Sequence, residues 1–154
     1  MKTIYATSCT ATHEARNGSV RSEDGHLDVK LAAPKELGGP GGGTNPEQLF
    51  AAGYAACFTS AMLRVAREAK TPIGKPAVTV HSGLRSDGPD RYALIAEVKV
   101  ALSDLDRDTA LSIVQGAHRI CPFSKAVGES LGVTVTLTDW QGATDGETLE
   151  LERA

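Results

Sequence analysis

The chain has 154 residues, of which 41% are hydrophobic and 23% are charged, the balance of an ordinary folded protein large enough to bury a core. A net charge of -3 and an aromatic content of 5% argue against nucleic-acid binding, which usually needs a basic surface with aromatic residues. No stretch is expected to span a membrane, and the first residues lack the apolar core of a secretory signal. We therefore expect a cytoplasmic protein whose three cysteines are free thiols, metal ligands or redox-active groups.

The first third of the chain is predicted to form β structure interrupted by turns. Two dipeptides that tolerate positive φ, Asn17-Gly18 and Asp24-Gly25, separate the expected strands. The glycine-rich run 37–43 cannot be regular structure, and it lacks the Lys-Ser/Thr ending of a phosphate-binding loop. We expect the strands of this region near residues 3–14, 19–23 and 26–32.

A long helix is predicted from Asn45 to about Lys70. Asn45 is a favourable N-cap, Pro46 suits the first helical position, and Gln48 completes a capping box. The first four turns are apolar nearly all round, and charged residues occur only late in the segment. This pattern predicts a central helix that is buried on most of its faces.

The second half of the chain combines strands with an interrupted helix. The helix is expected from near Asp106 to about Ile120, because Pro122 blocks its continuation, and a short helical turn follows at 123–129. Strands clustered in this way predict an α+β fold, with one domain over 1–140 and a polar tail over 141–154. The expected strands are 76–83, 133–137 and 91–102, and the last of these has its face of Tyr92, Leu94, Ala96, Val98, Val100 and Leu102 turned to one side.

Two of the cysteines stand in contexts that invite a redox interpretation. Cys57 lies within the apolar helix, where a lone cysteine is more often a small hydrophobic residue. Cys121 lies at a helix break before a proline, where a kink can expose a thiol and let it move. The two residues fit a disulfide-forming pair, although their spacing does not establish one. Cys9, in the first strand, has no matching feature and is interpreted as structural or incidental.

A metal site is the competing interpretation. His118 and Cys121 are two possible ligands one helical turn apart, and a structural zinc normally needs four. The other histidines are scattered along the chain, so a metal-binding module using His118 and Cys121 is the less favoured alternative. A serine hydrolase would need a Gly-x-Ser-x-Gly elbow, which the chain lacks.

Two motifs resemble those of a known family. The run Thr44–Phe58, with the sequence TNPEQLFAAGYAACF, resembles the signature of organic hydroperoxide resistance proteins in the OsmC/Ohr superfamily. The run Ala117–Ser124, with the sequence AHRICPFS, resembles the second cysteine motif of that family, and the similarity extends from about Thr3 to Trp140. Tyr54 favours the hydroperoxide-resistance branch, since the osmotically induced branch usually has histidine there. Phe123 departs from the tyrosine common at its position.

The resemblance implies an enzyme that reduces organic hydroperoxides to alcohols. In this interpretation Cys57 attacks the peroxide as a thiolate and becomes a sulfenic acid, and Cys121 then condenses with it to a disulfide. Arg16, oriented by Glu47, is the cation implied for the thiolate. No cofactor is implied, because the two sulfurs carry the electrons. The family precedent for the reductant is the dihydrolipoyl groups of lipoylated proteins.

The resemblance also implies an OsmC-like fold, with sheets wrapped around a central helix in an intertwined homodimer. Glu47 and Cys57 are ten positions apart, about 15 Å along a straight helix, and cannot share one site within it. Two antiparallel copies crossing near Ala52 would bring Glu47 of one copy towards Cys57 of the other. A second class of function stays open, a redox switch or binding protein without efficient turnover. The expected pocket, interface or core residues are Leu49, Phe50, Tyr54 and Phe58.

Overall fold

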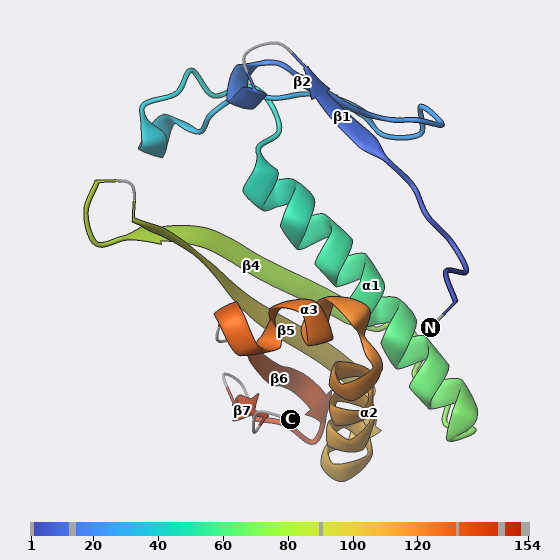
Figure 1. Cartoon of the computed structure of the whole chain (residues 1–154). Helices are drawn as coiled ribbons and strands as arrows, with labels where there is room; N and C mark the ends of the chain where they lie inside the picture. The colour runs from blue at the N-terminus through green and yellow to red at the C-terminus, as the bar shows by residue number, and fades with distance from the viewer. Residues whose placement is uncertain (1, 13–14, 90, 132, 145–146, 152–154) are drawn as a thin grey trace. The chain divides into compact units, whose positions relative to one another are not determined.

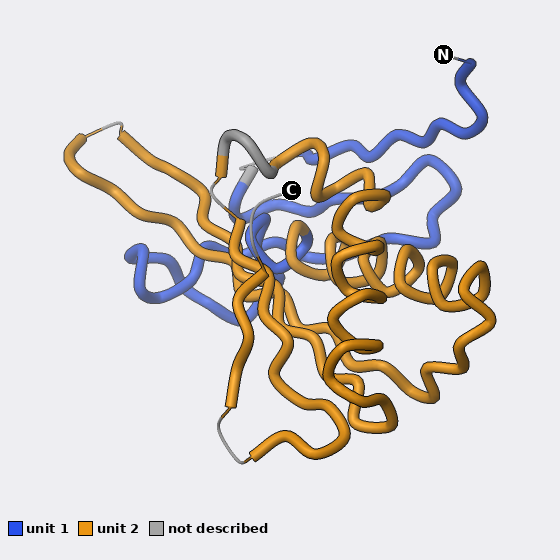
Figure 2. The backbone as a smooth tube through the Cα atoms, turned by 90° about the horizontal axis from the view of Figure 1, so that it is seen from below, with its two compact units in different colours: residues 1–49 blue, residues 50–154 orange. Residues whose placement is uncertain are grey.

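The chain folds into two compact units, Met1–Leu49 and Phe50–Ala154 (Figure 2). Helix α1 (Pro46–Glu68) begins in the first unit and continues into the second. Strands grouped in two sheets, with helices between them in the sequence, confirm the predicted α+β class (Figure 1). The prediction of a single domain over 1–140 stays a prediction. The computed structural model describes residues 2–12, 15–89, 91–131, 133–144 and 147–151.

The first unit contains a three-stranded antiparallel sheet in the order β1-β2-β3. Its first strand is shorter than the predicted 3–14, because pairing starts only at Cys9, opposite Ser22 at the end of β2. Residues 13–14 of that prediction lie outside the described residues. The turn after β2 contains Gly25 with a φ of 74°, as the dipeptide predicts. The strands are β1 (Cys9–Thr12), β2 (Ser19–Ser22) and β3 (Asp28–Lys30).

The glycine loop returns the chain to this sheet and fixes the start of α1. The Thr44 N–H donates to the Lys30 carbonyl at 2.9 Å, just before the helix begins. A Cβ atom at Gly39 would lie 2.2 Å from the Ala33 carbonyl oxygen, so only glycine allows this close approach. The Asn17 side chain accepts from the Ala33 N–H at 3.2 Å and ties the 3₁₀ helix η1 (Ala15–Asn17) to the same loop. A second 3₁₀ helix, η2 (Lys35–Leu37), lies within it.

Helix α1 begins with the predicted capping box. The Gln48 N–H donates to Asn45 Oδ1 at 2.9 Å, and the Asn45 N–H donates to Gln48 Oε1 at 3.1 Å. The prediction that most faces are buried is wrong for the single chain, because one face stays exposed while the opposite face packs into the core. The fully buried large side chains of the helix are Tyr54, Phe58 and Met62. The exposed face carries Ala52, Ala56, Ser60 and Leu63.

The apolar character of α1 also corrects the expectation about membrane-spanning segments. By length and composition alone, its 23 residues could cross a membrane, with a mean hydropathy of 1.4 in an 18-residue window. The core helix of a soluble protein meets the same criterion. The side chains that α1 buries among those of the sheet and of the neighbouring helices are consistent with that second interpretation.

The second unit contains a four-stranded sheet in the order β4-β5-β6-β7. The pair β5–β6 is parallel and the other pairs are antiparallel. Helices α2 (Arg107–Ile120) and α3 (Pro122–Leu131) connect the parallel strands, so the predicted helical turn is a ten-residue helix. The tail contributes a short strand that the sequence analysis does not predict. The strands are β4 (Ala77–Ser86), β5 (Tyr92–Asp106), β6 (Thr134–Gln141) and β7 (Leu149–Glu150).

The core of the second unit lies between the helices and the sheet. The alternation predicted for β5 is confirmed at its centre, where four side chains are buried, whereas Tyr92 at its start is 67% exposed. Asp106 caps α2 by accepting from the Thr109 N–H at 3.0 Å. The core joins α1, α2, β5 and β6, and the buried β5 residues are Ala96, Val98, Val100 and Leu102.

Candidate active site

Arg16 and Glu47 form an ion pair in the first unit. The Arg16 guanidinium donates to Glu47 Oε1 at 3.2 Å, and the side chain of Glu47 is 14% exposed whereas that of Arg16 is 46% exposed. Arg16 comes from η1 and Glu47 from the first turn of α1, where a carboxylate also suits the helix N-terminus. The contact between Arg16 and Glu47 is the one that the family resemblance implies, and their role stays a prediction.

The second oxygen of Glu47 is buried without a hydrogen-bond partner among the described residues. A buried carboxylate oxygen left unpaired costs free energy, so such groups are normally paired. Glu47 Oε2 is thus an open acceptor position beside the guanidinium of Arg16.

Cys57 and Cys121 come together in the second unit. Their sulfur atoms lie 3.6 Å apart, both residues are free thiols, and the Cys121 thiol donates to Cys57 Sγ. The predicted helix break is confirmed, since α2 ends at Ile120, Cys121 is its C-cap and Pro122 begins α3. The expectation that the break exposes Cys121 is wrong, because the core covers it completely while Cys57 is only partly buried.

The surroundings of Cys57 disfavour the ionised form of its thiol. Burial raises the pKa of the Cys57 thiol, a hydrogen bond from the Phe123 backbone N–H lowers it, and Cys121 raises it further. Because the pKa is raised overall, a nucleophilic thiolate at this position needs help from a donor or cation.

Three aromatic side chains pack against one another in the second unit, and one of them, Tyr54, lies close enough to interact with both thiols. Tyr54 stacks on Phe123 with ring centroids 5.7 Å apart, and Phe50 lies edge-on to Tyr54 at 5.9 Å. The Tyr54 hydroxyl shares a buried hydrogen bond of 3.0 Å with Ser124, a contact that the sequence analysis missed. The sequence signal for it is the run after Cys121, in which Phe123 and Ser124 both contact Tyr54.

The remaining cysteine and the candidate metal ligand His118 do not belong to a metal-binding cluster among the described residues. Cys9 is exposed on β1. His118 has a pKa lowered by burial, and its Nδ1 is buried without a hydrogen-bond partner among the described residues. In the part of the chain that the structure describes, no group of three or more His, Cys, Asp and Glu side chains gathers, so His118 and Cys121 find no further ligands there.

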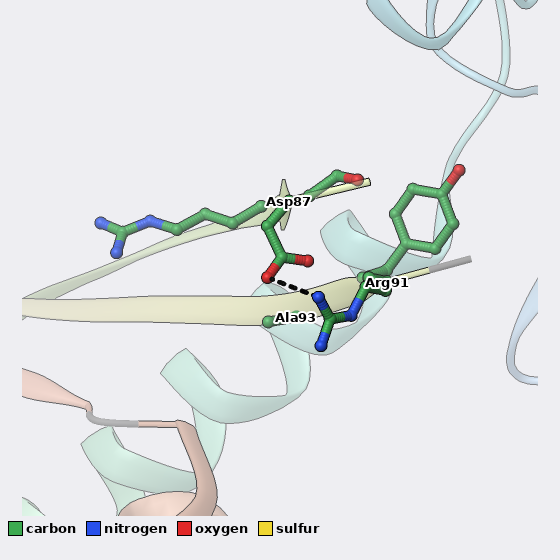
Figure 3. Close-up of a pocket in the computed structure, with 6 residues that line it drawn as sticks. Asp87, Arg91 and Ala93 are labelled. Carbon is green, nitrogen blue, oxygen red and sulfur yellow. Dashed lines mark ion pairs between the residues drawn. The ribbon is translucent and has the colours of Figure 1, made fainter. Parts of the chain in front are cut away.

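A shallow pocket lies elsewhere, at the end of the β4–β5 hairpin. It has a volume of about 510 Å³ and contains none of the predicted site residues. Arg91 reaches across it to Asp87, with 3.6 Å between Nη1 and Oδ2 (Figure 3). Its charged side chains are open to solvent, unlike the apolar surroundings of the thiols. The lining residues are Arg85, Ser86, Asp87, Arg91, Tyr92 and Ala93.

Comparison with known proteins identifies the fold. Residues 39–137 match the family model of OsmC-like proteins. The chain is 42% identical over 138 residues to the organic hydroperoxide resistance protein of Xanthomonas axonopodis pv. citri, covering 88% of this chain and 96% of that protein. An organic hydroperoxide resistance protein structure from Legionella pneumophila is similar with a TM-score of 0.81 and 40% identity, over 91% of this chain and 99% of that one.

A third similar structure is OhrB of Bacillus subtilis, with a TM-score of 0.75, 37% identity and coverage of 90% of this chain and 100% of that one. The fold and the matched family model define the class as OsmC-like. Within that class, the chain belongs to the organic hydroperoxide resistance branch of the OsmC/Ohr superfamily, as the two cysteine motifs predict.

Proposed function

We propose that the chain is a cysteine-based reductase of organic hydroperoxides. The observation that carries this proposal is the pair of free thiols 3.6 Å apart beside aromatic side chains, in a chain whose relatives are named for organic hydroperoxide resistance. A thiol pair within reach of disulfide formation is the minimum that a two-cysteine peroxidase needs.

The first step is an attack of the Cys57 thiolate on the outer oxygen of the hydroperoxide. A sulfur–oxygen bond forms, the oxygen–oxygen bond breaks, and the departing alkoxide takes up a proton and leaves as an alcohol. Cys57 is the nucleophile in this scheme because it is partly exposed, whereas Cys121 is fully buried and out of reach of a substrate. Cys57 ends the step as a sulfenic acid.

The second step is an attack of the Cys121 thiolate on the Cys57 sulfur. The disulfide forms and the sulfenic oxygen leaves as water after protonation. The sulfurs must approach from 3.6 Å to a bond of about 2.05 Å, a movement within the range of a side-chain rotation. An external dithiol then returns both cysteines to thiols by exchange.

We further propose that Arg16 and Glu47 assist the thiolate in a homodimer with composite sites. Both residues of this ion pair are held on one chain, and Glu47 keeps an unpaired buried oxygen. The exposed face of α1 carries Ala52 and Ala56, which are small enough for two antiparallel helices to approach closely. In that arrangement the ion pair of one chain serves the thiols of the other.

The aromatic side chains around the thiols favour an organic hydroperoxide over hydrogen peroxide, because an alkyl group gains from apolar contact. Dihydrolipoyl groups of lipoylated proteins are the proposed reductant, by family resemblance, and the cytoplasm is the proposed location. The raised pKa of Cys57 favours the second candidate, a redox switch or binding protein of the same fold that reacts without efficient turnover.

The test is peroxide consumption by the wild type, Cys57→Ser and Cys121→Ser with dihydrolipoamide as reductant. We expect the wild type to consume cumene hydroperoxide much faster than hydrogen peroxide, and Cys57→Ser to lose all turnover. Cys121→Ser should react once and accumulate a sulfenic acid. Oxidation of the wild type in a single round without repeated consumption would favour the switch, and consumption of neither peroxide would overturn the proposal.

A further inference from the structure

The first turn of α3 lies against the sulfur of Cys57. Cys121 is the C-cap of α2 and Pro122 begins α3, so Cys121 is the single residue between the two helices and the thiol pair is adjacent to the start of α3. The first N–H groups of a helix have no acceptor within it. Pro122 has no N–H to offer, so the Phe123 N–H is the first donor that α3 presents, and its interaction with Cys57 lowers the pKa of that thiol. The Lys125 N–H donates to the Cys121 carbonyl at 3.1 Å and closes the turn.

Two contacts hold this turn against α1. The hydroxyl groups of Tyr54 and Ser124 share a hydrogen bond of 3.0 Å, and both side chains are buried. The ring of Phe123 stacks on that of Tyr54 with an interplanar angle of 26°. Tyr54 lies on α1 one helical turn before Cys57. The contacts of Tyr54 therefore hold Phe123 and the start of α3 against the helix that contains Cys57.

We propose that the backbone N–H of Phe123 stabilises the Cys57 thiolate, and that the buried Tyr54–Ser124 hydrogen bond holds this donor against the sulfur. The catalytic meaning of the contact rests on the proposed function. A hydrogen bond to an ionised acceptor is shorter and stronger than one to a neutral group, and the N-terminal end of a helix adds a partial positive charge. Phe123 thus contributes its main chain to the reacting atom, and Tyr54 and Ser124 are positioning residues.

The balance of effects on Cys57 supports this assignment. Burial and the neighbouring Cys121 both raise the pKa of Cys57, and the Phe123 N–H is the contact that lowers it. The titratable groups that face the sulfur are Tyr54 on α1 and Cys121 at the junction of α2 and α3. Neither group is a cation. Within the second unit, the stabilisation of the Cys57 thiolate is therefore assigned to the Phe123 amide.

The decisive experiment compares two substitutions at one position. Phe123→Pro and Phe123→Ala both remove the ring, but only the proline removes the N–H, and proline is tolerated in the first turn of a helix. The readout is the rate of Cys57 alkylation by iodoacetamide against pH, followed on the Cys57 peptide of the reduced full-length protein by mass spectrometry. At pH 7 we expect alkylation about two- to fivefold slower in Phe123→Pro than in Phe123→Ala.

The Tyr54–Ser124 pair is tested with its own variants, so the proposal can still be tested if Phe123→Pro does not fold. Tyr54→Phe and Ser124→Ala should each raise the pH midpoint of alkylation, and the double variant should do so no more than either single one. Thr138→Val, which removes a hydroxyl bonded to the Val100 carbonyl at 3.1 Å in the sheet, is the matched control and should leave the midpoint unchanged.

Equal alkylation profiles for Phe123→Pro and Phe123→Ala would overturn the donor role. Unchanged midpoints in Tyr54→Phe and Ser124→Ala would overturn the positioning role. Alkylation involves no peroxide and no reductant, so this inference and the proposed function fail independently. A chain without peroxidase activity could still show a pH midpoint of Cys57 alkylation that depends on the Phe123 amide.

Discussion

At the scale of residues, two pairs of side chains carry the proposed chemistry. Cys57 and Cys121 have sulfur atoms 3.6 Å apart, and Arg16 and Glu47 form a partly buried ion pair. A thiol whose pKa is raised by burial reacts faster as the pH rises, because the thiolate fraction grows until the pH passes the pKa. Peroxide reduction that rises with pH is therefore expected for any variant that loses its thiolate-stabilising contacts.

Glu47→Gln tests the ion pair at the residue scale. The substitution keeps the size of the side chain but removes the charge that orients Arg16, and charge-assisted hydrogen bonds contribute about 1.5 to 3 kcal/mol. We expect the rate of organic hydroperoxide reduction at low substrate concentration to fall roughly tenfold to hundredfold, measured by stopped-flow oxidation. Asp28→Asn, which removes an exposed partner of Arg21, is the control. An unchanged rate in Glu47→Gln would remove Glu47 from the mechanism.

At the scale of elements, the site depends on how closely the helices pack. Gly116 of α2 faces Val65 of α1, and a Cβ atom at Gly116 would lie 2.8 Å from Val65 Cγ1. Val65 cannot move away easily, because a β-branched side chain in a helix has one strongly preferred rotamer. The same two helices carry Cys121 and Cys57, so their separation bears directly on the distance between the sulfurs.

Gly116→Ala is expected to lower the free energy of unfolding by about 1 kcal/mol, although alanine is the better helix former. The overpacking costs about 1 to 3 kcal/mol and the gain in helix propensity returns about 1 kcal/mol. The measurement is urea unfolding followed by circular dichroism. Val65→Ala in the same chain should make Gly116→Ala neutral or stabilising, and an equal loss in both backgrounds would contradict the close contact.

At the scale of the whole molecule, the two pairs of candidate site residues lie in different units of the chain. Arg16 and Glu47 belong to the first unit, and Cys57 and Cys121 to the second. Glu47 and Cys57 share α1 and are ten positions apart, about 15 Å along its axis. In the proposed homodimer, a second copy of the chain supplies the ion pair for each pair of thiols and also covers the exposed face of α1.

Subunit mixing tests the composite site. Arg16→Ala and Cys57→Ser should each be inactive alone, because each damages every site. Mixed dimers would contain one complete site, so an equimolar mixture that is unfolded and refolded together should recover about a quarter of the wild-type activity. Sedimentation of the mixture checks that dimers form. No recovery from sedimenting dimers would mean that each site is built within one chain.

The sequence by itself determined the class of the fold and the local features that begin and end its helices. Asn45 and Gln48 formed the predicted capping box, Pro122 broke the helix where expected, and the motifs around Cys57 and Cys121 identified the family. These features are local, since a cap or a proline acts on neighbours a few residues away. The centre of β5 was predicted for the same reason, because side chains alternate between the two faces of a strand.

Only the tertiary structure decided which groups meet. The approach of Cys121 to Cys57, the Tyr54–Ser124 hydrogen bond and the stacking of Phe123 on Tyr54 all join segments more than sixty residues apart in sequence. The length of the first strand and the exposure of one α1 face were also decided by tertiary contacts. A strand extends only where a partner strand pairs with it, and an apolar helix face is buried only where another surface covers it. Such contacts depend on packing between distant segments, which the periodicity of a single segment does not encode.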